Sequence, residues 1–243
     1  MIRSQRELAE VVQPGVEKLS STEKLLLRYE GILDWSRNNQ RVLIGVGVVL
    51  IAAAGGLWWW AGQRKINSEH ADTYLSRVMS FYFGGDYRHA IDGDKTRKLS
   101  GDPIYGLRYI VEEYGSTNAG KRAALILGNS YYAIGKYDSA MRAFDKASSD
   151  FPIAQASIEA GKASIFEHRG NKIDAAKLFE SAAKRDATNP LDADYLLSAA
   201  RDFEGANNKD DAIRIYKELL ADYPQSQFDD AAGRELLKMN IEL

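Results

Sequence analysis

The sequence predicts an all-α protein in which a single transmembrane helix precedes an α-solenoid, a stack of helix pairs. Two observations predict this fold class. Residues 42–61 form an uncharged stretch of membrane-spanning length, and from residue 119 onward one pattern of small, aromatic and proline positions recurs. We therefore expect four parts: an N-terminal amphipathic segment (1–41), the transmembrane helix (42–61), a long helix with an inserted loop and a degenerate first repeat (62–118), and the repeats with a capping helix (119–243).

The transmembrane prediction depends on the stretch VLIGVGVVLIAAAGGLWWWA, which lies between Arg41 and the pair Arg64-Lys65. A helix of this length is about 30 Å long, which is the hydrocarbon thickness of a bilayer. A core helix usually carries a polar stripe and a signal peptide begins near the N-terminus, whereas this segment has no polar stripe and begins at residue 42. The three tryptophans Trp58 to Trp60 suit an aromatic belt at a membrane interface. We interpret the segment as a retained single-span anchor.

The charges beside the span favour a cytoplasmic N-terminal segment and an external C-terminal domain. Arg28, Arg37 and Arg41 precede the span, while Arg64 and Lys65 follow it. Positively charged flanks tend to stay on the cytoplasmic side, so the balance favours an N-terminus inside the cell. The chain has no cysteine, which excludes disulfides, thiol catalysis, thiolate metal sites and a lipoprotein anchor.

The N-terminal segment itself predicts an amphipathic helix that leads into the span. Ser20 and Glu23 have the spacing of a capping box, which indicates a helix start. Apolar residues then recur at three- and four-residue spacing at Leu26, Tyr29, Ile32 and Leu33. Two roles remain open for this helix, a membrane-surface flank and a docking element for a cytoplasmic partner.

Beyond the span the helical spacing continues, and we expect the long helix to end near Gly84-Gly85. Residues 84–102 are polar and punctuated by glycine, which predicts an inserted loop. A further helix is expected from about Pro103, a favourable first helical residue, to Gly115.

From residue 119 the chain contains three copies of one pattern. The first copy has Leu127, Gly128, Tyr131, Gly135, Ala140, Phe144, Ala147 and Pro152. The second has Ala163, Phe166, Gly170, Ala175, Phe179, Ala182 and a delayed Pro190, and the third has Ala200, Phe203, Ala212, Tyr216 and Pro224. Small residues let paired helices approach closely and aromatic residues fill the space between them, so we expect these aromatics in the core.

These positions resemble the tetratricopeptide repeat, a helix–turn–helix unit with small, aromatic and proline positions at these offsets. The first copy matches at nearly every signature position, and the other two keep the small–aromatic–small skeleton. The resemblance implies a tetratricopeptide-type α-solenoid over about residues 119–226. It also implies that residues 235–243 belong to a terminal capping helix, and that helices 66–83 and 103–114 are a degenerate earlier copy.

In this register the first helix of each copy lines a concave surface. The residues predicted there are Arg122, Leu125, Asn129 and Tyr132 from the first copy, Ser164, Glu167 and His168 from the second, and Asp194, Leu197, Arg201 and Glu204 from the third. The set mixes apolar groups with both signs of charge, as a groove for a protein or peptide does. A merely solvated face is the alternative interpretation.

The sequence offers no catalytic constellation. It has no Gly-rich phosphate loop, no paired histidines at metal-ligand spacing and no serine elbow, so we expect no enzyme, no cofactor, no metal site and no small-molecule substrate. The net charge is −2, which makes nucleic acid an unlikely partner. We expect a non-enzymatic protein-interaction scaffold.

The order of the parts resembles the YfgM-like family of bacterial inner-membrane proteins: a short tail, one span, a long helix and degenerate tetratricopeptide repeats. The resemblance implies a periplasmic C-terminal domain and an accessory chaperone-type role at the Sec translocon. Its expected partners are a SecYEG-type channel, a PpiD-type chaperone or exported client proteins. The longer N-terminal tail and the insertion at 84–102 depart from that family. The alternative is a structural subunit of another inner-membrane complex.

Overall fold

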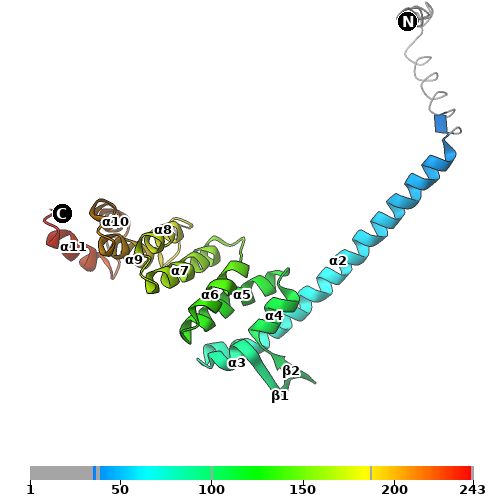
Figure 1. The fold of residues 1–243 in the computed structure, drawn as a ribbon, viewed down its shortest axis with the longest axis horizontal. Coiled ribbons are helices and arrows are strands. Elements are labelled where there is room, and N and C mark those ends of the chain that lie inside the picture. The colour runs from blue at the N-terminus through cyan, green and yellow to red at the C-terminus, as the bar shows by residue number, and fades with distance from the viewer. Residues whose placement is uncertain (1–34, 37–38, 100, 187, 242–243) are drawn as a thin grey trace, which may run out of the picture. The chain divides into compact units, whose positions relative to one another are not determined.

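The computed structural model describes residues 35–36, 39–99, 101–186 and 188–241 (Figure 1). The chain divides into two compact units, residues 1–62 and 63–243, and each is considered by itself. The helix predicted to begin at Ser20, with its apolar positions up to Leu33, lies outside the described residues.

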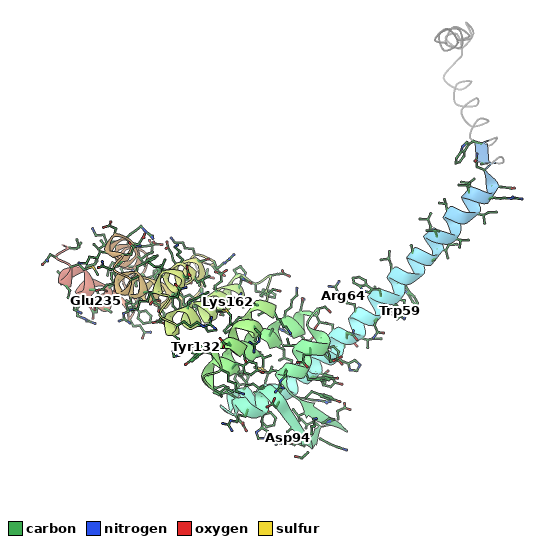
Figure 2. The ribbon with its side chains drawn as sticks, in the orientation of Figure 1. Trp59, Arg64, Asp94, Tyr132, Lys162 and Glu235 are labelled. Carbon is green, nitrogen blue, oxygen red and sulfur yellow. The ribbon has the colours of Figure 1, made fainter. Side chains whose placement is uncertain are left out.

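Helix α2 (Gln40–Phe83) carries the predicted span in its first half and is 44 residues long. The apolar side chains of that half are exposed, with Ile51 75% and Trp58 82% accessible. Trp59, labelled in Figure 2, is another member of this exposed set. Among the described residues α2 is the one helix long and apolar enough to cross a membrane, and none of its apolar window is buried inside the protein. This segment is therefore not a core helix.

The later part of α2 belongs to the second unit. Ala71, Leu75 and Val78 are buried there, at the three- and four-residue spacing of one helical face. The helix ends at Phe83, which confirms the end predicted near Gly84-Gly85.

The segment 84–102 is not a loop, and that prediction is wrong. It forms helix α3 (Tyr87–Asp92) and strand β1 (Gly93–Leu99), which pairs antiparallel with strand β2 (Asp102–Tyr105). This polar segment and strand β2 fold because a few of their apolar residues are buried: Ile91 and Ile104 are 3% and 2% exposed.

The helix predicted from Pro103 is also displaced, because Pro103 lies in β2 and helix α4 is Leu107–Tyr114. Two glycines cause the displacement. A Cβ on Gly93 would lie 2.5 Å from the backbone nitrogen of Gly106, so the chain can close the hairpin tightly only where both side chains are absent. Among the described residues, this two-stranded sheet is the one sheet in an otherwise helical fold.

The repeat region consists of consecutive helix pairs, as predicted (Figure 1). The helices are α5 (Asn118–Ala133), α6 (Tyr137–Lys146), α7 (Pro152–His168), α8 (Lys172–Ala183), α9 (Asp192–Gly205), α10 (Lys209–Asp222) and α11 (Asp229–Lys238). The turn inside each pair contains one left-handed residue, which is Gly135 at φ 73°, Gly170 at φ 77° or Asn207 at φ 61°. The third copy uses asparagine, which tolerates this conformation better than most side chains do.

The core between the helices follows the small–aromatic pattern. Ala140, Ala175 and Ala212 are fully buried, and so are Phe144 and Tyr216. The capping helix α11 is Asp229–Lys238, so it contains residues 235–238 of the expected segment, whereas residues 239–241 follow its end.

Candidate protein-binding groove

The candidate groove is the set of residues predicted on the first helices of the three pairs, α5, α7 and α9. Its exposed members are Arg122, Tyr132, Glu167, His168 and Arg201. Its half-buried members are Leu125, Asn129, Ser164, Asp194 and Glu204.

Leu197 does not belong to this surface. It is 3% exposed and packs in the core with Leu196 and Ala200, so the prediction for this residue is corrected. Burying a leucine side chain stabilises the fold by about 1.5–3 kcal/mol, whereas an exposed leucine on α9 would contribute nothing. The core therefore takes Leu197, and no partner can contact it.

An aromatic cluster occupies the part of the groove where α5 and α7 meet. The rings of Tyr132 and Tyr137 contact edge to face with centroids 5.4 Å apart. The ring of Tyr137 lies 3.8 Å from that of His168. An edge-to-face pair such as Tyr132 and Tyr137 is stabilising beyond its burial. The cluster joins the last turn of α5, the first residue of α6 and the last residue of α7.

Sequence reasoning missed Tyr137, because it belongs to the second helix of its pair. A signal for it exists in the chain. Tyr137 follows the turn at Gly135-Lys136 directly, so it begins α6 beside the residues that end α5.

Polar groups of α7 surround Tyr132, which is labelled in Figure 2. Burial raises the pKa of its hydroxyl, and the neighbouring Tyr137 and Glu167 raise it further, while the Ser164 hydroxyl lowers it. Tyr132 therefore keeps its proton at neutral pH and can donate a hydrogen bond. The structure thus brings together four of the predicted residues, which are Tyr132, Ser164, Glu167 and His168.

A buried carboxylate that the sequence did not indicate, Asp202, interacts with Glu167. Asp202 is 4% exposed, and its Oδ2 atom has no hydrogen-bond partner among the described residues. Burial raises the pKa of Asp202 to about 6; Glu167 also raises it and Lys172 lowers it. The carboxyl groups of Glu167 on α7 and Asp202 on α9 are therefore close enough to interact.

Two of the remaining predicted residues, Arg122 and Glu204, form contacts outside this cluster. Arg122 forms an ion pair with Asp72 of α2. The hydroxyl of Tyr216 donates to Glu204 Oε2 at 3.0 Å, so this carboxylate is held against the core. Asn129 and Asp194 stay half-buried along α5 and α9.

The groups on this surface are ones that suit noncovalent contacts with a protein. They are ring faces, hydroxyl groups, an imidazole and carboxylates within a small area. The described residues contain no group of three or more His, Cys, Asp or Glu side chains placed to hold a metal ion.

A comparison with protein families identifies the repeats. The family model for the tetratricopeptide repeat matches residues 122–152 and 194–226. Both segments are tetratricopeptide repeats. They cover the α5–α6 and α9–α10 pairs, and the α7–α8 pair that lies between them in the sequence has the same helix–turn–helix form. A comparison with curated proteins gives no match. Tetratricopeptide repeats stack into protein-interaction scaffolds, and this fold supports that general role.

Proposed function

We propose that the protein is a membrane-anchored scaffold that holds a protein partner in the candidate groove without chemistry. The observation that carries the proposal is the aromatic cluster of Tyr132, Tyr137 and His168, with Ser164 and Glu167 beside it. Ring faces accept apolar or aromatic side chains of a partner, and the hydroxyl and carboxylate groups accept or donate hydrogen bonds to its backbone.

The anchor in this proposal is the first half of α2, which crosses a bacterial inner membrane once. Its apolar side chains are exposed in the protein, so burial in lipid would remove them from water. The arginines before the span support a cytoplasmic N-terminus and therefore a periplasmic repeat domain.

Within that location we propose an accessory, chaperone-type role at the Sec translocon. The partners would be a SecYEG-type channel, a PpiD-type chaperone or exported clients. Support comes from the order of tail, span, long helix and repeats, which resembles the YfgM-like family. A surface that mixes aromatic and charged groups also suits broad, moderate affinity.

A second candidate is a structural subunit of another inner-membrane complex, and one observation favours it. Gly45, Gly47, Gly55 and Gly56 of the span have open space where a Cβ would be. Small residues let transmembrane helices approach each other closely, so this part of α2 can pack against other spans.

The experiment that separates the two roles is purification of the full-length protein in a mild detergent, with identification of the proteins that accompany it. The double variant Y132A/E167A removes groove contacts, and K177A/K217A, on the exposed sides of α8 and α10, serves as the matched control. Recovery of channel and chaperone components that Y132A/E167A loses and K177A/K217A keeps supports the translocon proposal. Recovery of a different complex in fixed ratio, undiminished by either variant, rejects it in favour of the structural subunit.

A further inference from the structure

A second surface of the repeat unit carries an excess of positive charge. Three hollows are lined by residues of α3, α4, α5 and α6 and by Arg169, which follows α7. Adjacent hollows share lining residues, which are Arg108, Lys136, Ser139 and Arg142. We call this the basic surface. Its cations are Arg88, Arg108, Lys136, Arg142, Lys146 and Arg169, and its carboxylates are Asp92, Glu112 and Asp138.

Ion pairs inside the basic surface neutralise only part of this charge. Arg108 pairs with Asp92, and Arg169 pairs with Asp138. The four other cations make no ion pair with a carboxylate of the described residues, and Glu112 alone remains to balance them. The side chain of Arg142 donates to Ser139 Oγ at 3.0 Å and keeps further donors available. This excess of positive charge is a property of the basic surface and not of the whole chain, which has a net charge of −2.

Of the three hollows in the basic surface, the one between α4 and α6 has the most apolar lining. Its floor is made by Val111, Leu127 and Ala143, which are 6%, 4% and 4% exposed. Its rim is made by Arg108, Arg142 and Lys146, and its volume is about 170 Å³. A ligand that fits this hollow has a small apolar group with negative charges on either side of it.

We propose that the basic surface binds an acidic segment of a protein partner. An apolar side chain of that segment occupies the hollow between α4 and α6, and its carboxylates meet Arg142 and Lys146 on one side and Arg88 and Lys136 on the other. Guanidinium groups bind carboxylates through paired, charge-assisted hydrogen bonds.

Other anionic partners fit the surface less well. A lipid phosphate or a nucleic-acid backbone offers no small apolar group beside each charge, so the floor of Val111, Leu127 and Ala143 would stay uncovered. The surface adjoins the aromatic cluster of the candidate groove, because Tyr137 lines one of its hollows, whereas the hollow between α4 and α6 contains no residue of that cluster. The two can therefore hold different parts of one partner or two partners. The inference stands even if the groove binds nothing.

The test uses the full-length protein in detergent micelles and a fluorescein-labelled peptide of glutamates interrupted by leucines. A peptide with glutamine in place of each glutamate tests the charge requirement. The charge-reversal variant R142E/K146E changes the rim of the hollow, and K177E/K217E makes the same change of charge on α8 and α10. The helical circular-dichroism signal and the melting temperature of each variant verify that it is folded.

The proposal expects saturable binding of the glutamate peptide that weakens with added salt. Binding should weaken at least about tenfold in R142E/K146E, since both attractions become repulsions, and change little in K177E/K217E. It is overturned if the wild-type protein does not bind the glutamate peptide saturably, if the glutamine peptide binds equally well, or if both variants lose binding alike. Tighter binding to vesicles with anionic headgroups than to the peptide, lost in R142E/K146E, would also overturn it in favour of a lipid surface.

Discussion

Phe144 shows at the scale of single residues how neighbouring repeats are held together. Its ring is fully buried, and glycines of two helices lie against it. A Cβ on Gly128 of α5 would lie 2.5 Å from the ring, and a Cβ on Gly161 of α7 would lie equally close. The ring is thus fixed from two sides. Gly128 could be predicted from the repeat pattern, whereas Gly161 could not, because its role depends on where α7 crosses the ring.

Replacing Gly128 by alanine therefore destabilises the repeat unit although alanine favours helix. The gain in helix propensity is about 1 kcal/mol, whereas overpacking a filled site costs about 1–3 kcal/mol, so we expect a net loss of about 1 kcal/mol. Chemical denaturation of G128A measures it. In an F144L background the smaller side chain leaves room, and the same substitution should cost less. A more stable G128A protein would contradict this packing.

The raised pKa of Asp202 predicts how the free energy of unfolding depends on pH. Its pKa is about 6 in the folded protein against the usual 3.8, so between about pH 4 and pH 6 the folded state holds a proton that the unfolded chain has lost. The free energy of unfolding therefore falls as the pH rises through this window. In D202N that contribution is absent, and at pH 7 we expect the variant to be more stable by at least on the order of 1 kcal/mol.

Denaturation of wild-type and D202N proteins across pH 4 to 7 tests this expectation. D210N, at the exposed start of α10, controls for the loss of one carboxylate. Equal pH dependence in wild type and D202N, or a less stable D202N at pH 7, would show that Asp202 has a compensating partner.

At the scale of elements, helix α5 begins at a buried cap. The Thr117 hydroxyl accepts from the backbone N–H of Gly120 at 3.0 Å and donates to the carbonyl of Tyr114 at 2.7 Å. Thr117 is 4% exposed, so water cannot easily replace these bonds. One side chain thus joins the end of α4 to the start of the first complete repeat.

The substitution T117V keeps the shape of the side chain and removes both hydrogen bonds. We expect a loss of about 1–2 kcal/mol in the free energy of unfolding. T117S retains the hydroxyl and should lose much less. Thermal or chemical denaturation of the two variants gives the comparison, and equal losses would indicate that the methyl group of Thr117 matters more than its cap.

Some helices and strands could be predicted from the sequence and others could not. Helix pairs need small and aromatic residues at fixed offsets, so the repeats and their turns could be predicted from the sequence alone. The hairpin of β1 and β2 could not, because glycine and polar residues usually indicate a loop and the fold of this segment depends on anchors such as Ile91 and Ile104. Tyr137 and Asp202 joined the candidate site through contacts between helices, which a single-helix pattern does not contain.

At the scale of the whole molecule, the chain combines a helix able to cross a membrane with a repeat unit that presents side chains for recognition. The span depends only on length and composition, so the sequence predicts it directly. The proposed centre of recognition depends on how α5, α6 and α7 meet, and only the structure shows that Tyr132, Tyr137 and His168 form one cluster.

The central claim is that the groove holds a protein partner, and site-specific photo-crosslinking in native membranes tests it most directly. A photoreactive amino acid replaces Tyr132 or His168 in the groove, or Lys177 or Lys217 on the second helices of the pairs. The account predicts a discrete crosslinked protein from the two groove positions, lost when Glu167 is also changed to alanine, and none from the other two. Crosslinks from Lys177 and Lys217 with none from the groove would contradict it.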